Sequence, residues 1–152
     1  MSSPSDIRMV NVGEKPVTRR QAEAKGRVLM QAATLKLLKQ GKLPKGDVLA
    51  AARVVGIMAA KETHRLIPLC HPLLIEDVNI EFSIDEKTPA VEVMATVKGS
   101  GKTGFEMEAL TAVAISGLTI YDMCKTVDQT LRLDGIRLTK KSGGKSGSIS
   151  LE

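Results

Sequence analysis

The apolar positions between residues 104 and 125 predict a long helix at the centre of the fold. They recur at intervals of three and four residues, which places them on one buried stripe: Leu110, Val113, Ala114, Gly117, Leu118 and Tyr121. Small residues such as Ala109 and Ala112 permit close packing on a second face. Thr103 precedes this stretch and is expected to cap the first free backbone N–H groups.

The segment from residue 18 to residue 41 also predicts a helix. Thr18 is a candidate N-cap, Gly41 ends the pattern, and Arg19 and Arg20 would fall in the first turn. Because cations are disfavoured at a helix N-terminus, these arginines are candidate anion ligands, with ordinary solvated arginines as the default alternative. The apolar stripe would consist of Val28, Leu29, Ala32, Leu35 and Leu38.

A further helix is expected to begin after Asp47, a good N-cap residue, and to end between Ala60 and Thr63. Alternation of apolar and polar residues then predicts two strands, at residues 77–85 and 90–98. The short linker between them favours an antiparallel hairpin.

Two shorter strands are expected, at residues 9–12 and 136–140. With the helices, they give a single domain over residues 1–152. One antiparallel sheet with helices on one face satisfies this order of elements, so the predicted fold class is α+β, a ferredoxin-like two-layer sandwich. Residues 1–8 and the Gly- and Ser-rich residues 142–152 are expected to be flexible.

Composition narrows the possible functions. The 152 residues are 43% hydrophobic, which is enough for one domain with a real core. The net charge of +5 favours anionic partners, but an aromatic content of 2% is too low for a protein that stacks nucleic-acid bases. We expect no membrane span and no cofactor. Cys70 and Cys124 suit a reduced cytoplasmic protein, and two histidines and two cysteines without ligand spacing argue against a metal site.

The segment at residues 66–72, LIPLCHP, places a histidine in an unusual setting. Pro68 and Pro72 forbid a helix, and we expect the segment to be extended and mostly buried. Cys70 and His71 would then point in opposite directions, which excludes a Cys–His dyad within one chain. A core histidine bonded to a backbone carbonyl is the simpler interpretation, but the two prolines favour a functional placement.

Three polar residues of the central helix are candidates for chemistry. Asp122 and Lys125 are three residues apart and therefore neighbours near its C-terminal end. Glu108 lies about 21 Å from Asp122 along the helix axis, so the two acids cannot meet in one small site of one subunit. If both touch a substrate, they belong to different copies in an oligomer. The alternative is a capping glutamate at one end and a surface ion pair at the other.

Two Gly-Lys segments resemble a phosphate loop only superficially. The loop needs a glycine five residues before its Gly-Lys pair, and those positions are Thr96 for residues 101–103 and Thr139 for residues 144–146. Neither segment supports an ATPase. Both still supply backbone donors and lysines, which is the chemistry of an anion cradle.

Five motifs together resemble one family: KGD at 45–47, LCHP at 69–72, GKTGFEMEALTA at 101–112, LTIYDMCK at 118–125 and KSGGKSG at 141–147. The family is cyclic pyranopterin monophosphate synthase, and the resemblance runs from about residue 9 to residue 147. It implies a lyase of molybdenum cofactor (molybdopterin) biosynthesis. Such an enzyme converts 3′,8-cyclo-7,8-dihydroguanosine 5′-triphosphate, made by an upstream radical enzyme, to cyclic pyranopterin monophosphate and pyrophosphate. The resemblance also implies a ferredoxin-like fold and a homo-hexamer of dimers with active sites at the dimer interface.

The same resemblance implies roles for individual residues. Asp122 and Lys125 would be catalytic, and we hypothesise that they form a general acid–base pair. The substrate contacts would be Leu69, Cys70, His71, Met107 and Glu108. Further basic residues would hold the triphosphate: Arg20, Lys45, Lys141 and Lys145. The alternatives from other classes are a non-catalytic phosphate- or nucleotide-binding module and a purely structural oligomer subunit.

Overall fold

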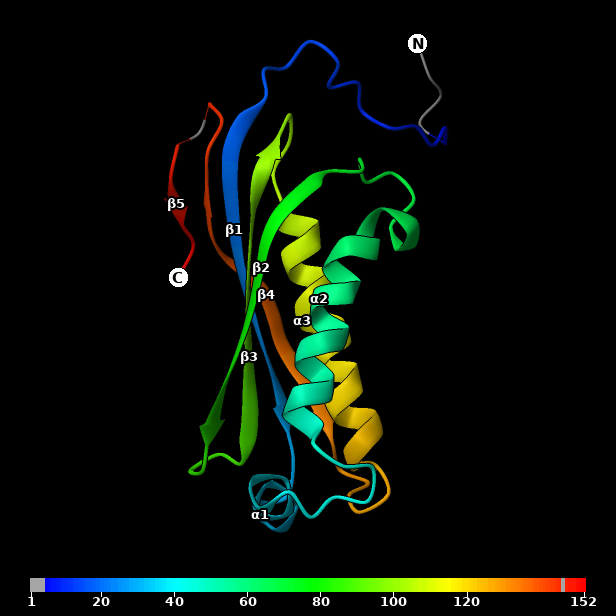
Figure 1. Cartoon of the computed structure of the whole chain (residues 1–152), viewed down its shortest axis with the longest axis vertical. Helices are drawn as coiled ribbons and strands as arrows, with labels where there is room; N and C mark the ends of the chain where they lie inside the picture. The colour runs from blue at the N-terminus through cyan, green and yellow to red at the C-terminus, as the bar shows by residue number, and fades with distance from the viewer. Residues whose placement is uncertain (1–4, 146) are drawn as a thin grey trace.

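The computed structural model describes residues 5–145 and 147–152 and shows one antiparallel sheet with two long helices packed on one face (Figure 1). The strands are β1 (Thr18–Leu29), β2 (Leu74–Asp85), β3 (Ala90–Gly101), β4 (Arg132–Ser142) and β5 (Ile149–Ser150). The helices are α1 (Ala32–Gln40), α2 (Val48–Leu66) and α3 (Glu106–Cys124).

The sheet has the strand order β2-β3-β1-β4-β5, and its paired strands are antiparallel. Without the short elements α1 and β5, the chain reads β1-α2-β2-β3-α3-β4, with β1 and β3 in the middle of the sheet. This is the ferredoxin-like arrangement, and the predicted fold class is confirmed.

Most of the predicted elements are present. The α2 helix begins after Asp47, whose side chain accepts a hydrogen bond from the backbone N–H of Ala50 at 3.1 Å, and it runs to Leu66. The strands β2, β3 and β4 contain the predicted segments and extend beyond them. The central helix is α3, but its N-cap is Phe105 rather than Thr103, and the cap side chain forms no hydrogen bond within the described residues.

The helix predicted over residues 18–41 is wrong in its first half. Residues 18–29 form β1, which pairs with β3 on one side and β4 on the other. The buried residues Ala22, Ala24 and Val28 alternate with polar ones at a period of two, and Gly26 completes the inward row. A Cβ atom at Gly26 would lie 2.8 Å from Val113 Cγ1, so glycine lets α3 pack directly onto β1.

The second half of that helix is confirmed as α1, which ends at Gly41 with φ of 67°. Arg19 and Arg20 therefore lie in a strand rather than in a first helical turn. The strand predicted at residues 9–12 is also absent, because these residues follow an exposed path outside the sheet. The expected flexibility of both ends stays a prediction, and residues 1–4 and Ser146 lie outside the described residues.

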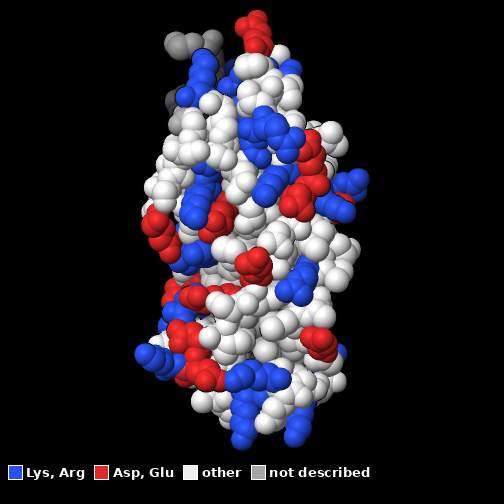
Figure 2. Space-filling model, turned by 60° about the vertical axis from the view of Figure 1, so that its left-hand side comes forward, with Lys and Arg blue, Asp and Glu red and all other residues white. Residues whose placement is uncertain are grey.

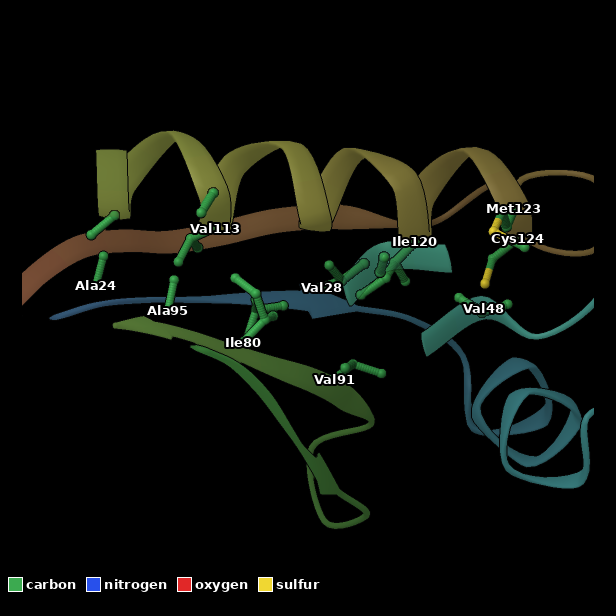
Figure 3. Close-up of a cluster of buried hydrophobic side chains, with 14 of the residues drawn as sticks. Ala24, Val28, Val48, Ile80, Val91, Ala95, Val113, Ile120, Met123 and Cys124 are labelled. Atoms are coloured by element: carbon green, nitrogen blue, oxygen red, sulfur yellow. The ribbon is translucent and has the colours of Figure 1, made fainter. Parts of the chain in front are cut away.

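The core lies between the sheet and the α2–α3 pair. Figure 3 shows Val113 and Ile120 of α3 pointing toward Ile80 and Val91 of the sheet. The two helices approach closely where Ser116 Oγ donates to the backbone oxygen of Ala52 at 3.0 Å. These contacts hold α3 between the sheet and α2, and the two ends of α3 carry the candidate residues.

The other face of the sheet carries charged residues of both signs, as the view in Figure 2 shows. Arg27 pairs with Asp85 at 2.6 Å, and Arg137 pairs with Glu152 at 2.5 Å. Such mixed pairs are typical of a solvated sheet face.

Among the described helices, α3 alone has the length and mean hydropathy of a membrane span, contrary to the expectation that no apolar run would suffice. Half of its 18-residue window is buried within the domain, and the core helix of a globular domain passes the same test. This feature is therefore weak evidence for a membrane.

Candidate active site

The first group of candidate residues surrounds Asp122, in the last turn of α3. Lys125 Nζ lies 2.9 Å from its Oδ1 atom, and Lys45 Nζ donates to its Oδ2 atom at 2.9 Å. The hydrogen bond from Lys45, followed by that from Lys125, lowers the pKa of Asp122 below its ordinary value. The side chains remain about half exposed, so a substrate can reach them.

The structure thus confirms that Asp122 and Lys125 are neighbours. It adds Lys45, which the sequence had grouped with the phosphate-binding residues. Lys45 comes from the turn between α1 and α2, next to Gly46, which has φ of 107° and therefore favours glycine. We name Lys45, Asp122 and Lys125 the acid–base group.

The second group lines a pocket of about 430 Å³ at the opposite end of α3. Four cations and one carboxylate contribute side chains: Lys15, Arg20, Lys141, Lys145 and Glu106. Arg20 Nε donates to the backbone oxygen of Gly101 at 3.1 Å, and Lys141 Nζ lies 3.6 Å from Glu106 Oε1. We name this the basic pocket.

Glycines of the β4–β5 connection form one wall of the basic pocket. Gly143 has φ of 102°, and a Cβ atom there would collide with the backbone oxygen of Arg19. The close approach brings Lys141 and Lys145 to Arg20, and these are three of the four cations expected to hold the triphosphate. The fourth, Lys45, lies at the other end of α3, on Asp122. Lys15 was missed, because nothing in the sequence shows that residues 7–17 turn toward this pocket.

The third group lies beside the basic pocket, at the first turn of α3. Cys70 Sγ lies 3.7 Å from Oε2 of Glu108, which is only 3% exposed. The other oxygen, Oε1, has no hydrogen-bond partner within the described residues. Burial raises the pKa of Glu108, and burial followed by the charge of Glu108 raises the pKa of Cys70 to about 11. At neutral pH Cys70 is therefore a thiol that can donate to Glu108.

His71 Nε2 lies 2.7 Å from the backbone oxygen of Val10. Cys70 Sγ also lies 3.7 Å from the backbone oxygen of His71, whereas the His71 ring has Val10 as its partner. That the two side chains point apart stays a prediction. The expectation of a mostly buried segment is wrong, because Leu69 is 42% exposed and both prolines are exposed. Met107 is 37% exposed, so Leu69 and Met107 offer apolar surface to a ligand. Leu69, Cys70, His71, Met107 and Glu108 form the LCHP group.

The three groups do not form one site within a single chain. Glu106 and Glu108 lie in the first turn of α3, next to the basic pocket and the LCHP group. Asp122 lies in the last turn, about 21 Å away along the helix axis. One chain therefore carries two separate sets of candidate residues, at the two ends of α3, the helix that runs along the sheet in Figure 1. Within residues 5–145 and 147–152, no cluster of His, Cys, Asp or Glu could hold a metal ion.

The fold and these groups define a ferredoxin-like α+β protein with a cation-lined pocket and a lysine-held carboxylate. The model of the MoaC family matches residues 9–144, and the chain belongs to this family. It is 61% identical over 147 residues to cyclic pyranopterin monophosphate synthase of Chloroflexus aurantiacus, covering 97% of this chain and 90% of the relative. It is 59% identical over 140 residues to the synthase of Parvibaculum lavamentivorans, covering 92% and 88%.

A de novo designed protein with ferredoxin fold shares 13% identity and a TM-score of 0.42, covering 87% of this chain and 93% of the designed chain. This likeness is too low to carry an argument. The fold assignment rests on the strand order and pairing described above.

Proposed function

We propose that this chain is a cyclic pyranopterin monophosphate synthase. It would convert 3′,8-cyclo-7,8-dihydroguanosine 5′-triphosphate to cyclic pyranopterin monophosphate with release of pyrophosphate, in molybdenum cofactor biosynthesis. Relatives with this name match nearly the whole chain at up to 61% identity. The observation that carries the proposal is Asp122, held between Lys45 and Lys125 on an accessible surface. A module that only binds phosphate has no need of a carboxylate there.

The acid–base group suits the closure of a cyclic phosphate diester. A hydroxyl group attacks the innermost phosphorus and must lose a proton, while pyrophosphate leaves with additional negative charge. The lowered pKa of Asp122 keeps it ionised at neutral pH, so it can receive a proton. Lys125 can supply one, and Lys45 and Lys125 together neutralise charge on the leaving group.

The groups at the other end of α3 suit the remainder of the substrate. Arg20, Lys141 and Lys145 would bind the phosphate chain in the basic pocket. Among the described residues, the buried Oε1 atom of Glu108 has no hydrogen-bond partner, and it could accept a hydrogen bond from the amino or ring N–H groups of the guanine-derived end. Leu69 and Met107 would contact its ring. The exposed apolar area of both supports this placement.

A complete site would combine the acid–base group of one copy with the basic pocket and the LCHP group of another. The 21 Å separation supports such sharing, because a substrate of this size cannot reach both ends of α3. The outward faces of α2 and α3 expose Val54, Met58 and Leu118 by more than half, which suits contact between copies. We infer a dimer as the functional unit and a hexamer of three dimers as the assembly. Two free cysteines support a cytoplasmic location.

The test is pyrophosphate release from the cyclic dihydro-GTP compound and, separately, from GTP. We expect release from the cyclic compound alone, and its loss in the Asp122→Asn and Lys125→Gln variants. Both substitutions are on an exposed surface, so circular dichroism should show folded protein. Binding of both nucleotides without release would identify a nucleotide-binding module instead and remove the catalytic roles of Asp122 and Lys125.

A further inference from the structure

The proposed reaction does not account for the N-terminal arm, which we define as residues 7–17. The arm runs outside the sheet (Figure 1). Its residue Val10 is 73% exposed. The arm is nevertheless held at two places. His71 Nε2 lies 2.7 Å from the backbone oxygen of Val10, and Lys102 Nζ donates to the backbone oxygen of Gly13 at 3.0 Å. The arm is therefore anchored directly before Lys15.

A turn follows these anchors and brings Lys15 to the basic pocket. The Lys15 backbone N–H donates to the backbone oxygen of Val12 at 3.1 Å, and the Lys15 side chain then lines the pocket together with Arg20, Lys141 and Lys145. The arm thus connects the LCHP group, through His71, with the basic pocket, through Lys15.

The charges in the basic pocket are not balanced. Glu106 is the only carboxylate among the described lining residues, and it lies 3.6 Å from Lys141. In the described part of the chain, neither Lys15 nor Lys145 has a carboxylate within ion-pair distance. Four cations with one carboxylate repel one another, and an anion in the pocket would relieve that repulsion.

We propose that Lys15 is a polyphosphate-binding residue of the basic pocket and that the N-terminal arm positions it there. A lysine ammonium is a compact point charge that binds phosphate oxygens. Most exposed lysines are simply solvated, but side chains of the folded domain hold this arm at both Val10 and Gly13, which is more than a solvated arm needs. The proposal takes only the identity of the physiological ligand, a triphosphate, from the proposed function.

The test is calorimetric titration of the purified full chain with inorganic tripolyphosphate, which requires no turnover. We expect Lys15→Gln to weaken binding about fivefold, because an exposed charged contact contributes on the order of one tenfold step or less. Lys15→Arg should bind within about twofold of the parent chain, since it keeps the charge. Lys87→Gln is the matched control, because it makes the same charge change in the exposed β2–β3 turn.

Three results would overturn the proposal: no binding of tripolyphosphate by the parent chain, unchanged binding by Lys15→Gln, or equal weakening by Lys15→Gln and Lys87→Gln. If pyrophosphate release from the cyclic substrate fails while Lys15→Gln weakens tripolyphosphate binding, the proposed function is wrong and this inference stands. The two failures are therefore distinguishable.

The role of the arm is tested by the Lys102→Met variant, which removes the contact to Gly13. Lys102→Met should weaken tripolyphosphate binding when Lys15 is present, because the arm then no longer positions Lys15. In a Lys15→Gln background it should have little further effect, because the contact between Lys15 and the phosphate is already lost. Equal weakening in the two backgrounds would show that Lys102 acts through its charge, and would contradict positioning by the arm.

Discussion

Asp128 connects the loop after the acid–base group to α1, and its replacement tests how firmly this end of the molecule is held. The side chain is 3% exposed. Its Oδ2 atom accepts from the backbone N–H of Gln31 at 2.9 Å and from Thr34 Oγ1 at 2.8 Å. Its Oδ1 atom accepts from the backbone N–H of Thr130 at 2.7 Å and from its hydroxyl at 2.6 Å. Gln31 is the N-cap of α1 and provides no side-chain cap, so Asp128 provides the cap from a distant loop.

The expected magnitude follows from these bonds. Burial alone would raise the pKa of Asp128, but the hydrogen bonds from Gln31 and Thr130 outweigh it and lower the pKa from 3.8 to about 2. Such a shift corresponds to about 2 kcal/mol, of which an asparagine keeps a part because its side-chain oxygen still accepts hydrogen bonds. Asp128→Asn should therefore lower the free energy of unfolding by about 1–2 kcal/mol. Asp128→Ala, which leaves two backbone N–H groups without an acceptor, should cost about 2–4 kcal/mol.

The assay is denaturant unfolding at equal protein concentration, with the exposed Asp77→Asn as control. Because the pKa is lower in the folded state, the stabilisation by Asp128 is present above pH 3.8 and is lost as the pH falls toward 2. The difference between the parent chain and Asp128→Asn should shrink over that range. An Asp128→Ala variant within 0.5 kcal/mol of the parent, a change typical of ordinary surface sites, would refute the reasoning.

Three further predictions concern the core and the LCHP group. Glu108→Gln should abolish pyrophosphate release yet unfold at an equal or higher temperature at pH 8. Burial raises the pKa of Glu108, so the stability of the parent chain falls as the pH rises through that pKa, and the neutral glutamine avoids this loss. A large drop in the melting temperature of the variant would contradict the prediction. Cys70 should react slowly with iodoacetamide at pH 7.5, because burial keeps it a thiol; labelling as fast as that of a free peptide thiol would oppose this. Gly56→Ala should destabilise the fold by about 2–3 kcal/mol in denaturant unfolding, because its Cβ atom would collide with Ser116 Oγ; unchanged stability would show that α2 and α3 can separate freely.

The sequence predicts the elements whose pattern has one dominant period. The 3.6-residue stripe of α3 and the alternation in β2 and β3 belong to this class, and all three elements were found. The sequence predicts helix in place of β1 because the inward residues of this strand are Ala22, Ala24 and Gly26, which are too small to mark a strand by hydrophobicity. They are small because α3 packs closely on β1, and the sequence does not state which element faces which.

The candidate site was predictable where its residues are close in sequence. Asp122 and Lys125 lie on adjacent turns of one helix, and their contact follows from helix geometry. The contacts of Lys45 with Asp122 and of Cys70 with Glu108 join residues 77 and 38 positions apart, and only the fold brings them together. Lys15 depends on the path of an irregular arm, for which no periodic signal exists.

The central claim, a synthase whose sites are shared between copies, is tested most directly by mixing two inactive variants. Asp122→Asn removes the carboxylate of the acid–base group. Glu108→Gln removes the carboxylate that is proposed to bind the guanine-derived end of the substrate, at the other end of α3. An equal mixture of the two variants is unfolded and refolded, so that about half of the dimers contain one copy of each. If each site combines opposite ends of α3 from different copies, every mixed dimer has one intact site out of two. Pyrophosphate release should then return to about a quarter of the parental rate. A mixture that stays as inactive as its components, although mixed dimers are present, would contradict the shared site.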